Sequence, residues 1–375
     1  MEIYIVVCVF SVFIAVVLSK LKINGNNVPI SVKVIVTALP SIFITGLRYG
    51  IGTDYYTYEN WFLISSRMDF FSGNFTDIIQ HFLGISDDFR DPLFMMYNQL
   101  IDYLGGDFYI SIFVLSIITF GIIFFWIYYD SPSPWLSTYL LFGMTYFYIY
   151  MNAMRQMIAQ SFLVLALVFF SRGKKTLTII FFLIAIAIHH AAWFFLPVFL
   201  FSKIKIDARI ILFITPLIFI SSYVFKEVFA SLISVLNYSQ YTQNGQYFGV
   251  VVFWEFLWQI LLTLLSYWVY YIDKAETIAQ QNTFKIYFNI QVFSLWIYAF
   301  SGQIAYNEMH RVLWIYGLPS IVFTSMVINR ISNRWLRYSC YTGIVVGFFI
   351  YMYVLIDPLQ YHRVIPYESI FEVLH

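Results

Sequence analysis

Charged residues are scarce in this sequence. Only 11% of its 375 residues are Asp, Glu, Lys or Arg, whereas soluble domains carry about a quarter. Hydrophobic residues reach 61%, and the deficit of charge extends along the whole chain. Such a composition excludes a water-soluble globular domain and indicates a protein that is solvated by lipid.

A surplus of positive charge is also lacking. The net charge is +1, which does not favour a nucleic-acid-binding function. The two cysteines, Cys8 and Cys340, lie inside apolar runs without a neighbouring histidine. We interpret them as small apolar fillers rather than as a disulfide or a metal site.

Several catalytic signatures are missing. The sequence has no glycine-rich nucleotide loop, no Walker lysine and no H-E-x-x-H helix. The energy for any reaction must therefore arrive within the substrate, and we expect neither a cofactor nor a metal ion.

Long apolar runs fill most of the chain. Backbone polar groups inside hydrocarbon must be satisfied within their own segment, so each run predicts a helix. The run 3–19 has no basic residues before it, and we interpret it as a retained first helix. The predicted spans lie near 3–19, 30–47, 107–129, 135–154, 155–170, 209–226, 249–272, 286–301, 312–328 and 338–356.

The segment 176–201 has a different pattern. Lysines and arginines flank both of its ends, which suggests that both ends face the cytoplasm. Since one crossing cannot begin and end on the same side, we predict two short helices that turn around His189 and His190. The expected fold is an all-α polytopic membrane protein, 1–375, with about ten full spans plus this pair.

The distribution of basic residues orients the chain. With the N-terminus placed in the periplasm, most lysines and arginines fall on the cytoplasmic side, around 20–33, 172–175, 203–209, 274–285 and 330–337. Only Asp130, Asp207, Asp273 and Glu276 accompany them there. Two loops then face the periplasm. The loop 48–106 contains amphipathic stretches at 58–71 and 94–104, and the loop 227–248 has a Tyr-, Asn- and Gln-rich core at 238–247.

Four groups of ionisable residues fall on this predicted periplasmic side. The first is Arg48-Tyr-Gly-Ile-Gly-Thr-Asp54-Tyr-Tyr-Thr-Tyr58, in which Gly50 and Gly52 permit a close approach of the backbone to a ligand. The others are Asn152-Ala-Met-Arg155-Gln156, the pair His189-His190, and Asn307-Glu308-Met-His310-Arg311.

Each group also has a plain structural interpretation. An arginine at a helix end can snorkel to the interface, a histidine at a helix break can simply be hydrogen-bonded, and Glu308 can pair with Arg311 along one helix face. Their coincidence on the less basic side favours a function, because ionisable residues at membrane depth are costly. Two or three guanidinium groups suit a lipid diphosphate, and a carboxylate or imidazole suits proton removal from an acceptor hydroxyl.

These motifs resemble those of the EpsG family, which includes Wzy-type O-antigen and exopolysaccharide polymerases. R-Y-G-I-G-T-D-Y-Y-T-Y resembles the family's first signature, and M-N-A-M-R-Q-M-I-A its second arginine motif. A-I-H-H-A-A-W-F-F-L-P, E-M-H-R-V-L-W-I-Y and the segment Val364-Ile-Pro-Tyr367 resemble later motifs in the same order. One departure is that Ala191 and Ala192 follow the histidines, where the family often has a serine.

The resemblance implies a GT-C-like glycosyltransferase of the bacterial inner membrane with a periplasmic active site. It would move a growing glycan from undecaprenyl diphosphate onto a lipid-linked oligosaccharide repeat unit; membrane lipids and a chain-length regulator are further candidate partners. By this resemblance the candidate catalytic residues are Asp54 (first choice of base), His190 and Glu308. The candidate substrate-binding residues are Arg48, Gly50, Gly52, Tyr55, Tyr58, Arg155, Gln156, His189, His310 and Arg311.

Two other functions fit part of this pattern. A flippase or transporter for lipid-linked sugars also needs arginines that face a diphosphate, but its charges should lie in a central cavity that opens to each side in turn. A membrane acyltransferase could use histidine as a base, but its acyl donor would arrive from the cytoplasm. The predicted periplasmic placement of the charged groups favours the polymerase.

Overall fold

The structure is a computed structural model of the 375-residue chain. It describes residues 1–23, 25–67, 91–201, 204–235, 248–272, 278–301 and 307–373. At 225–235, 248–252, 271–272, 278–281 and 307–310 the helical backbone is described without the side chains. The core 238–247 of the second predicted loop lies outside the described residues, as do 68–71 of the first amphipathic stretch.

The described residues form two compact units, Met1–Trp193 with Ser339–His375, and Phe194–Tyr338. The prediction of one transmembrane domain over 1–375 stays a prediction. The helices of the first unit are α1 (Glu2–Lys20), α2 (Ile30–Gly46), α3 (Tyr55–Ser65), α5 (Pro92–Tyr103), α6 (Phe108–Asp130), α7 (Pro134–Gly143), α8 (Tyr146–Asn152), α9 (Met154–Ser171), α10 (Lys175–Ile188), most of α17 (Arg334–Ile356) and α18 (Ile370–Val373).

The second unit consists of helices as well. They are α11 (Leu196–Phe201), α12 (Ala208–Val235), α13 (Phe248–Ile272), α14 (Ile278–Ser301), α15 (Asn307–Gly317) and α16 (Ser320–Asn329). Within this unit α14 packs against α12, α13 and α15. A buried hydrogen bond from Gln291 Nε2 to Gln259 Oε1, 2.7 Å long, joins α14 to α13. Polar side chains of this kind hold helices together where the hydrophobic effect cannot.

Among the described residues, five helices are long and apolar enough to cross a membrane. They are Glu2–Lys20, Phe108–Asp130, Met154–Ser171, Arg311–Asn329 (which includes the break between α15 and α16) and Arg334–Ile356. Shorter apolar helices cover Ile30–Gly46, Lys175–Ile188, His190–Phe201 and Ala208–Val224. The helical prediction is therefore confirmed for the described residues, apart from a two-stranded hairpin, β1 (Lys22–Ile23) with β2 (Asn26–Asn27), in register Lys22 to Asn27. The count of ten spans and the GT-C likeness stay predictions.

Some predicted spans are interrupted. The run 135–154 divides into α7 and α8 at Thr145, whose φ of 65° lies in the left-handed region. The run 312–328 divides at Leu318 and Pro319, between α15 and α16. Both breaks place backbone irregularity inside apolar sequence, which hydropathy alone does not reveal. The expected break at His189 and His190 is present, because α10 ends at Ile188 and a 3-10 helix covers His190–Phe195.

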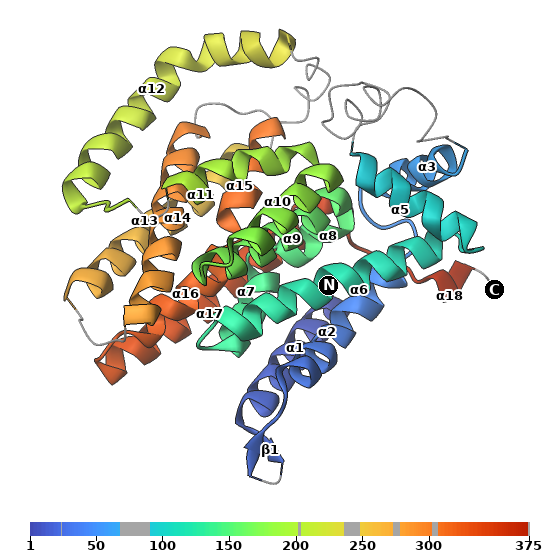
Figure 1. Ribbon diagram of the computed structural model, residues 1–375, viewed down its shortest axis with the longest axis horizontal. Coiled ribbons are helices and arrows are strands. Elements are labelled where there is room, and N and C mark those ends of the chain that lie inside the picture. Colours follow the sequence, from blue (N-terminus) through green and yellow to red (C-terminus); the bar gives the residue numbers. More distant parts are fainter. Residues whose placement is uncertain are drawn as a thin grey trace. The chain divides into compact units, whose positions relative to one another are not determined.

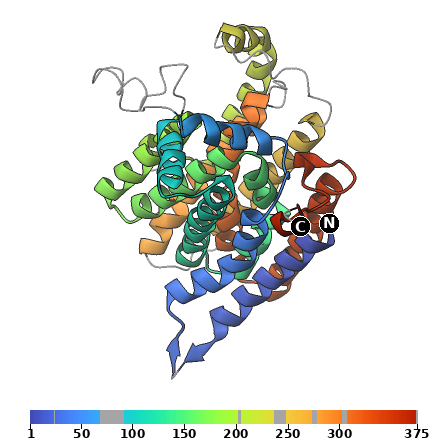
Figure 2. The same cartoon turned by 90° about the vertical axis from the view of Figure 1, so that its right-hand side faces the viewer.

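Close packing of α2 against α6 sets the position of the first motif. Figures 1 and 2 show α1 and α2 side by side, joined through the hairpin. At the end of α2, a Cβ on Gly46 would lie 2.6 Å from Cδ2 and 3.1 Å from Cα of Phe113 on α6. Only glycine allows this approach, so Gly46 fixes where α2 ends and where Arg48 begins the motif.

The C-terminal segment holds the first motif in place. The amide of Tyr49 donates to the Glu368 carbonyl, and the amide of Ile370 donates to the Leu47 carbonyl, both over 2.9 Å. Tyr4 of α1 donates to the carbonyl of Val364 over 2.6 Å. Hydrogen bonds therefore join the C-terminal segment to both the first motif and α1.

We expect Gly46→Ala to lower the stability of the purified protein by about 1–3 kcal/mol, because the added methyl group forces α2 away from Phe113. The measurement is the midpoint of thermal unfolding in detergent. Gly121→Ala on α6 is the matched control, since its Cβ would meet nothing within 4 Å. Equal midpoints for the two variants would contradict the packing argument.

Candidate functional site

Arg48 lies in the protein interior at the end of α2. Its residue surface is 1% exposed. Nη1 donates to the Thr45 carbonyl, Nη2 lies 3.6 Å from Sδ of Met154, and the guanidinium is 5.5 Å from the centre of the Tyr150 ring. No carboxylate in the described part of the chain forms an ion pair with Arg48. The structure therefore holds a buried cation at the first motif.

The glycines after Arg48 bring the first motif onto the second. Gly50 and Gly52 have φ of +61° and +98°. A Cβ on Gly52 would collide with the carbonyl oxygen of Met151, in the last turn of α8. The adjacent Thr53 hydroxyl donates to Oδ1 of Asn152. Gly52 is thus required both by its backbone conformation and by the contact between the two motifs.

A third segment joins this contact. Nδ2 of Asn152 donates to Nδ1 of His362 over 3.1 Å, and the Gly52 amide donates to the Arg363 carbonyl over 3.3 Å. Burial lowers the pKa of His362 to about 3, so this imidazole is neutral and its Nδ1 is available as an acceptor. The hydrogen bonds link three parts of the sequence that are far apart along the chain.

The most charged cluster of the first unit surrounds Asp91, the residue before α5. Its Oδ2 lies 2.8 Å from Nη1 of Arg155 on α9 and 3.2 Å from Nδ1 of His189. Its Oδ1 lies 3.2 Å from Nδ1 of His190 and accepts from the His190 amide over 3.1 Å. The Asp91 side chain is 2% exposed, so one buried carboxylate collects four donors.

Aromatic rings enclose the Arg155 guanidinium. Its Cζ lies 5.0 Å from the ring centre of Trp61, 5.7 Å from that of Tyr58 and 5.8 Å from that of Phe94. Trp61 and Tyr58 come from α3 and Phe94 from α5. Cation–π contacts and the carboxylate hold the arginine in one orientation. Its side chain nevertheless keeps 20% exposure, whereas that of His190 keeps 33%.

The electrostatics of the cluster follow from its composition. Burial alone would raise the pKa of Asp91, but His189 and Arg155 outweigh that effect and bring the pKa well below its usual range. Asp91 is therefore ionised. A carboxylate that receives Nδ1–H from an imidazole leaves Nε2 of that ring as the basic atom. Proton acceptance by His190 is the chemistry that this arrangement offers.

The same three residues have the spacing of a metal site. One ligand atom from each of Asp91, His189 and His190 lies within 4.8 Å of the others. The Arg155 guanidinium, however, already occupies Oδ2 of Asp91 at 2.8 Å. A divalent cation bound to Asp91 would be repelled by the positive charge of Arg155. The ion pair between Asp91 and Arg155 is therefore favoured over a metal centre.

The structure brings most of the sequence-predicted residues of the first three motifs together within the first unit. Arg155, His189, His190 and Tyr58 share the Asp91 cluster, and Gln156 is buried one residue further along α9. Tyr55 is buried beside Phe108, with ring centres 5.4 Å apart. Asp54, at the start of α3, is half-buried. The pKa of Tyr58 is raised mainly by burial, and the negative charge of Asp54 raises it further.

The fourth motif lies in the other unit. Arg311 is on α15, half-buried, within Phe194–Tyr338. The structure does not describe the side chains of Glu308 and His310. The predicted meeting of Arg311 with Arg48 and Arg155 stays a prediction.

Sequence reasoning missed the central residue. Asp91 is one of eight acids within 48–106, so its residue type alone did not distinguish it. The available signal was Asp91-Pro92, because proline is favoured at the first position of a helix, which places Asp91 at a helix start. His362 and Thr53 were missed too, since their roles arise from contacts with Asn152.

We expect the stability of the protein to fall as the pH drops below about 4. The unfolded Asp91 carboxyl takes up a proton near pH 3.9, whereas the folded one stays ionised to lower pH, so acid favours unfolding. Asp91→Asn should lose stability already at pH 7, by about 3–5 kcal/mol for the unpaired arginine, and should respond less to acid. Thermal unfolding at a series of pH values measures both effects.

The control for this prediction is Asp102→Asn, a change of an exposed residue in the last turn of α5. It should follow the wild type at every pH. An Asp91→Asn curve parallel to the wild type would mean that the Asp91 carboxylate is not stabilised by its neighbours.

Comparison with known proteins agrees with the motifs. No curated protein and no solved structure gives a significant match. A family model described as the EpsG family matches residues 32–369. This match includes the first, second, histidine and fourth motifs and the C-terminal segment as far as Ser369, in which the Glu368 carbonyl accepts from the Tyr49 amide. Since it covers nearly the whole sequence in one alignment, the chain belongs to the EpsG family.

Proposed function

We propose that this protein is a polysaccharide polymerase of the bacterial inner membrane. It transfers a growing glycan from undecaprenyl diphosphate onto a lipid-linked repeat unit at the periplasmic face. The observation that carries the proposal is the Asp91 cluster, in which a partly exposed guanidinium and a partly exposed imidazole share one buried carboxylate. Membership of the EpsG family supports the substrate class.

Arg155 is proposed to bind the donor diphosphate. The carboxylate and the three rings orient its side chain, and Nη1 alone is used by Asp91. Its buried Nε has no hydrogen-bond partner among the described residues. A planar fork of donors that is held in place stabilises the charge that develops on a leaving diphosphate. Arg311, from the fourth motif, is proposed to complete the clamp.

His190 is proposed to act as the general base. Asp91 holds its Nδ1, and Nε2 takes the proton from the acceptor hydroxyl. The acceptor oxygen then forms the new bond to the anomeric carbon, while the bond from that carbon to the diphosphate oxygen breaks and the electron pair leaves with the diphosphate. The resulting imidazolium is stabilised by the Asp91 carboxylate, which acts as a positioning residue.

The remaining predicted residues receive supporting roles. Asp54, at the start of α3, is proposed to position the acceptor; its Oδ1 accepts a hydrogen bond from the Thr53 hydroxyl over 3.3 Å. The wall of the proposed substrate-binding site consists of Gly50, Gly52, Tyr55, Tyr58, Gln156 and His189. Arg48 contributes a buried positive charge close to that wall.

We expect purified protein, given a lipid-linked repeat unit, to produce a ladder of longer lipid-linked products on a gel. Arg155→Ala should reduce the ladder by at least about a hundredfold, since a charge-stabilising donor is lost. Arg155→Lys should restore little, because an ammonium cannot give two parallel hydrogen bonds. Repeat-unit translocation without a ladder would point to a flippase instead.

The matched control is Arg172→Ala. Arg172 also pairs with a buried carboxylate, Asp130 at 2.7 Å, and lies 4.1 Å from the ring centre of Tyr129, but it belongs to a predicted cytoplasmic segment. It should leave the ladder intact. A ladder lost equally in both variants would show a general effect of unpairing a carboxylate.

We expect His190→Ala to lower kcat by about 10²–10⁴-fold with little change in KM, because proton removal is lost while the diphosphate clamp remains. Initial rates of repeat-unit addition measure this. His189→Ala is the comparison: His189 shares Asp91 but its side chain is 5% exposed, so its loss should act mainly on stability. Unchanged kcat in His190→Ala would remove this residue from the mechanism.

A further inference from the structure

The chain after α17 buries one imidazole, that of His362. This residue is 7% exposed, whereas Arg363 beside it is exposed. Gln360, His362 and Arg363 have φ of 50°, 71° and 49°, in the left-handed region that residues other than glycine seldom adopt. Such conformations persist where neighbouring contacts hold them, and they cluster at functional sites. The turn therefore directs a single side chain inward against the preference of its backbone.

The His362 ring meets the side chain of Asn152, the last residue of α8. Nδ2 of Asn152 donates to Nδ1 of His362 over 3.1 Å. On the other side, the Thr53 hydroxyl of the first motif donates to Oδ1 of the same amide. Both polar atoms of the Asn152 side chain are therefore used, each by a segment that is far away along the chain.

Asn152 stands at the junction between α8 and α9. Only Ala153 separates the two helices, and Arg155 is the second residue of α9. The backbone supports the same junction, because the Gly52 amide donates to the Arg363 carbonyl over 3.3 Å. A side chain that is held from both sides at the end of α8 fixes the direction in which α9 begins.

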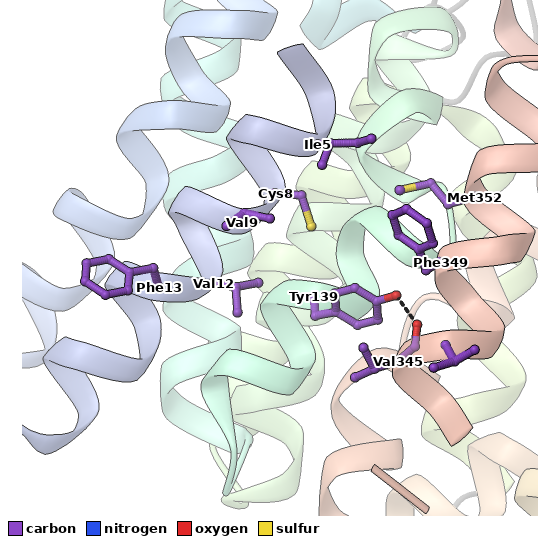
Figure 3. A pocket seen from close by; sticks show the side chains of 10 residues that line it. Ile5, Cys8, Val9, Val12, Phe13, Tyr139, Val345, Phe349 and Met352 are labelled. Atoms are coloured by element: carbon purple, nitrogen blue, oxygen red, sulfur yellow. Dashed lines mark hydrogen bonds between the residues drawn. The ribbon is translucent and has the colours of Figure 1, made fainter. Parts of the chain in front are cut away.

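The C-terminal segment is anchored on both sides of its buried imidazole. Before it, the Tyr139 hydroxyl of α7 holds α17 by donating to the Val345 carbonyl over 2.5 Å (Figure 3). After it, the Tyr367 hydroxyl donates to the Ile44 carbonyl of α2 over 3.1 Å. A segment that is fixed before and after the turn can hold Asn152 in place rather than merely follow it.

We propose that His362 is a positioning residue for Arg155 and acts through the Asn152 amide. The hydrogen bond from Asn152 holds the start of α9, and with it the guanidinium that lies 2.8 Å from Asp91. A misplacement of about 1 Å in such a group can cost about 100-fold in rate. The inference deepens the proposed function, on which it rests for the reaction that Arg155 serves.

The test compares the chemical reactivity of Arg155 with the rate of transfer. The purified protein is treated with phenylglyoxal, which modifies guanidinium groups, and mass spectrometry of the peptides gives the modification rate of Arg155. Arg172 is the internal reference in each sample, because it also pairs with a buried carboxylate and its side chain is 31% exposed. The ladder assay gives kcat and KM for the same variants.

Three variants weaken the hold on Asn152: His362→Ala, Asn152→Ala and Thr53→Val. We expect each to speed the modification of Arg155 several-fold, and His362→Ala to lower kcat by about 10–100-fold with a smaller change in KM. His362→Ala should add little in the Asn152→Ala background, since both remove the same contact. Thr53 is exposed, so Thr53→Val decides the question if His362→Ala does not fold.

Two further variants separate positioning from stability. His362→Asn is the rescue, because an amide places a hydrogen-bonding atom where the imidazole has Nδ1 and asparagine tolerates a φ of 71°. Both measurements should return close to the wild-type values. Tyr367→Phe is the matched control, since it removes the bond of the same segment to Ile44 and leaves Asn152 untouched. It should lower the unfolding temperature without changing Arg155 modification or kcat.

Four results would overturn the inference: unchanged Arg155 modification in His362→Ala and Thr53→Val, an equal rise in Tyr367→Phe, no recovery in His362→Asn, or an unchanged kcat in His362→Ala. Arg155 modification is scored without any transfer reaction. The expected modification pattern in a protein that forms no ladder would therefore contradict the polymerase proposal and leave the placement of Arg155 by His362 standing.

Discussion

The Asp91 carboxylate is the interaction on which the candidate site depends. A single buried anion receives an arginine from α9, two imidazoles from the break after α10 and the backbone amide of His190. Taking these charged groups out of water is costly, and the cost is offset only while every donor is present. The arrangement therefore fixes α5, α9 and the histidine break relative to one another.

The first motif, α8 and the C-terminal segment also help to position this cluster. Gly52 and Thr53 contact the end of α8, and α9 begins two residues after Asn152, so the first motif determines where Arg155 starts its helix. The C-terminal segment then covers the motif through backbone pairing. Uncharged neighbours thus help to position the start of α9, in addition to the ion pair between Arg155 and Asp91.

The sequence predicted the parts of the site that depend on local composition. Apolar runs revealed the spans, and the break at His189 and His190 followed from basic residues at both ends of 176–201. Contacts between segments that are far apart along the chain could not be predicted from the sequence. Asp91 could not be chosen among the eight acids of the loop 48–106. Asp54 was favoured as base because it lies inside the most recognisable motif, whereas both histidines contact Asp91 in the structure. Breaks at Thr145 and Pro319 were hidden by uniform hydropathy.

The C-terminal pairing has a consequence for biosynthesis. Tyr367 donates to the carbonyl of Ile44 across 323 residues of sequence, and the neighbouring backbone bonds join the same two segments. Translation reaches Tyr367 only after every apolar run has been made. The backbone on either side of Arg48 therefore gains its C-terminal hydrogen-bond partners only when the synthesis of the chain is almost finished.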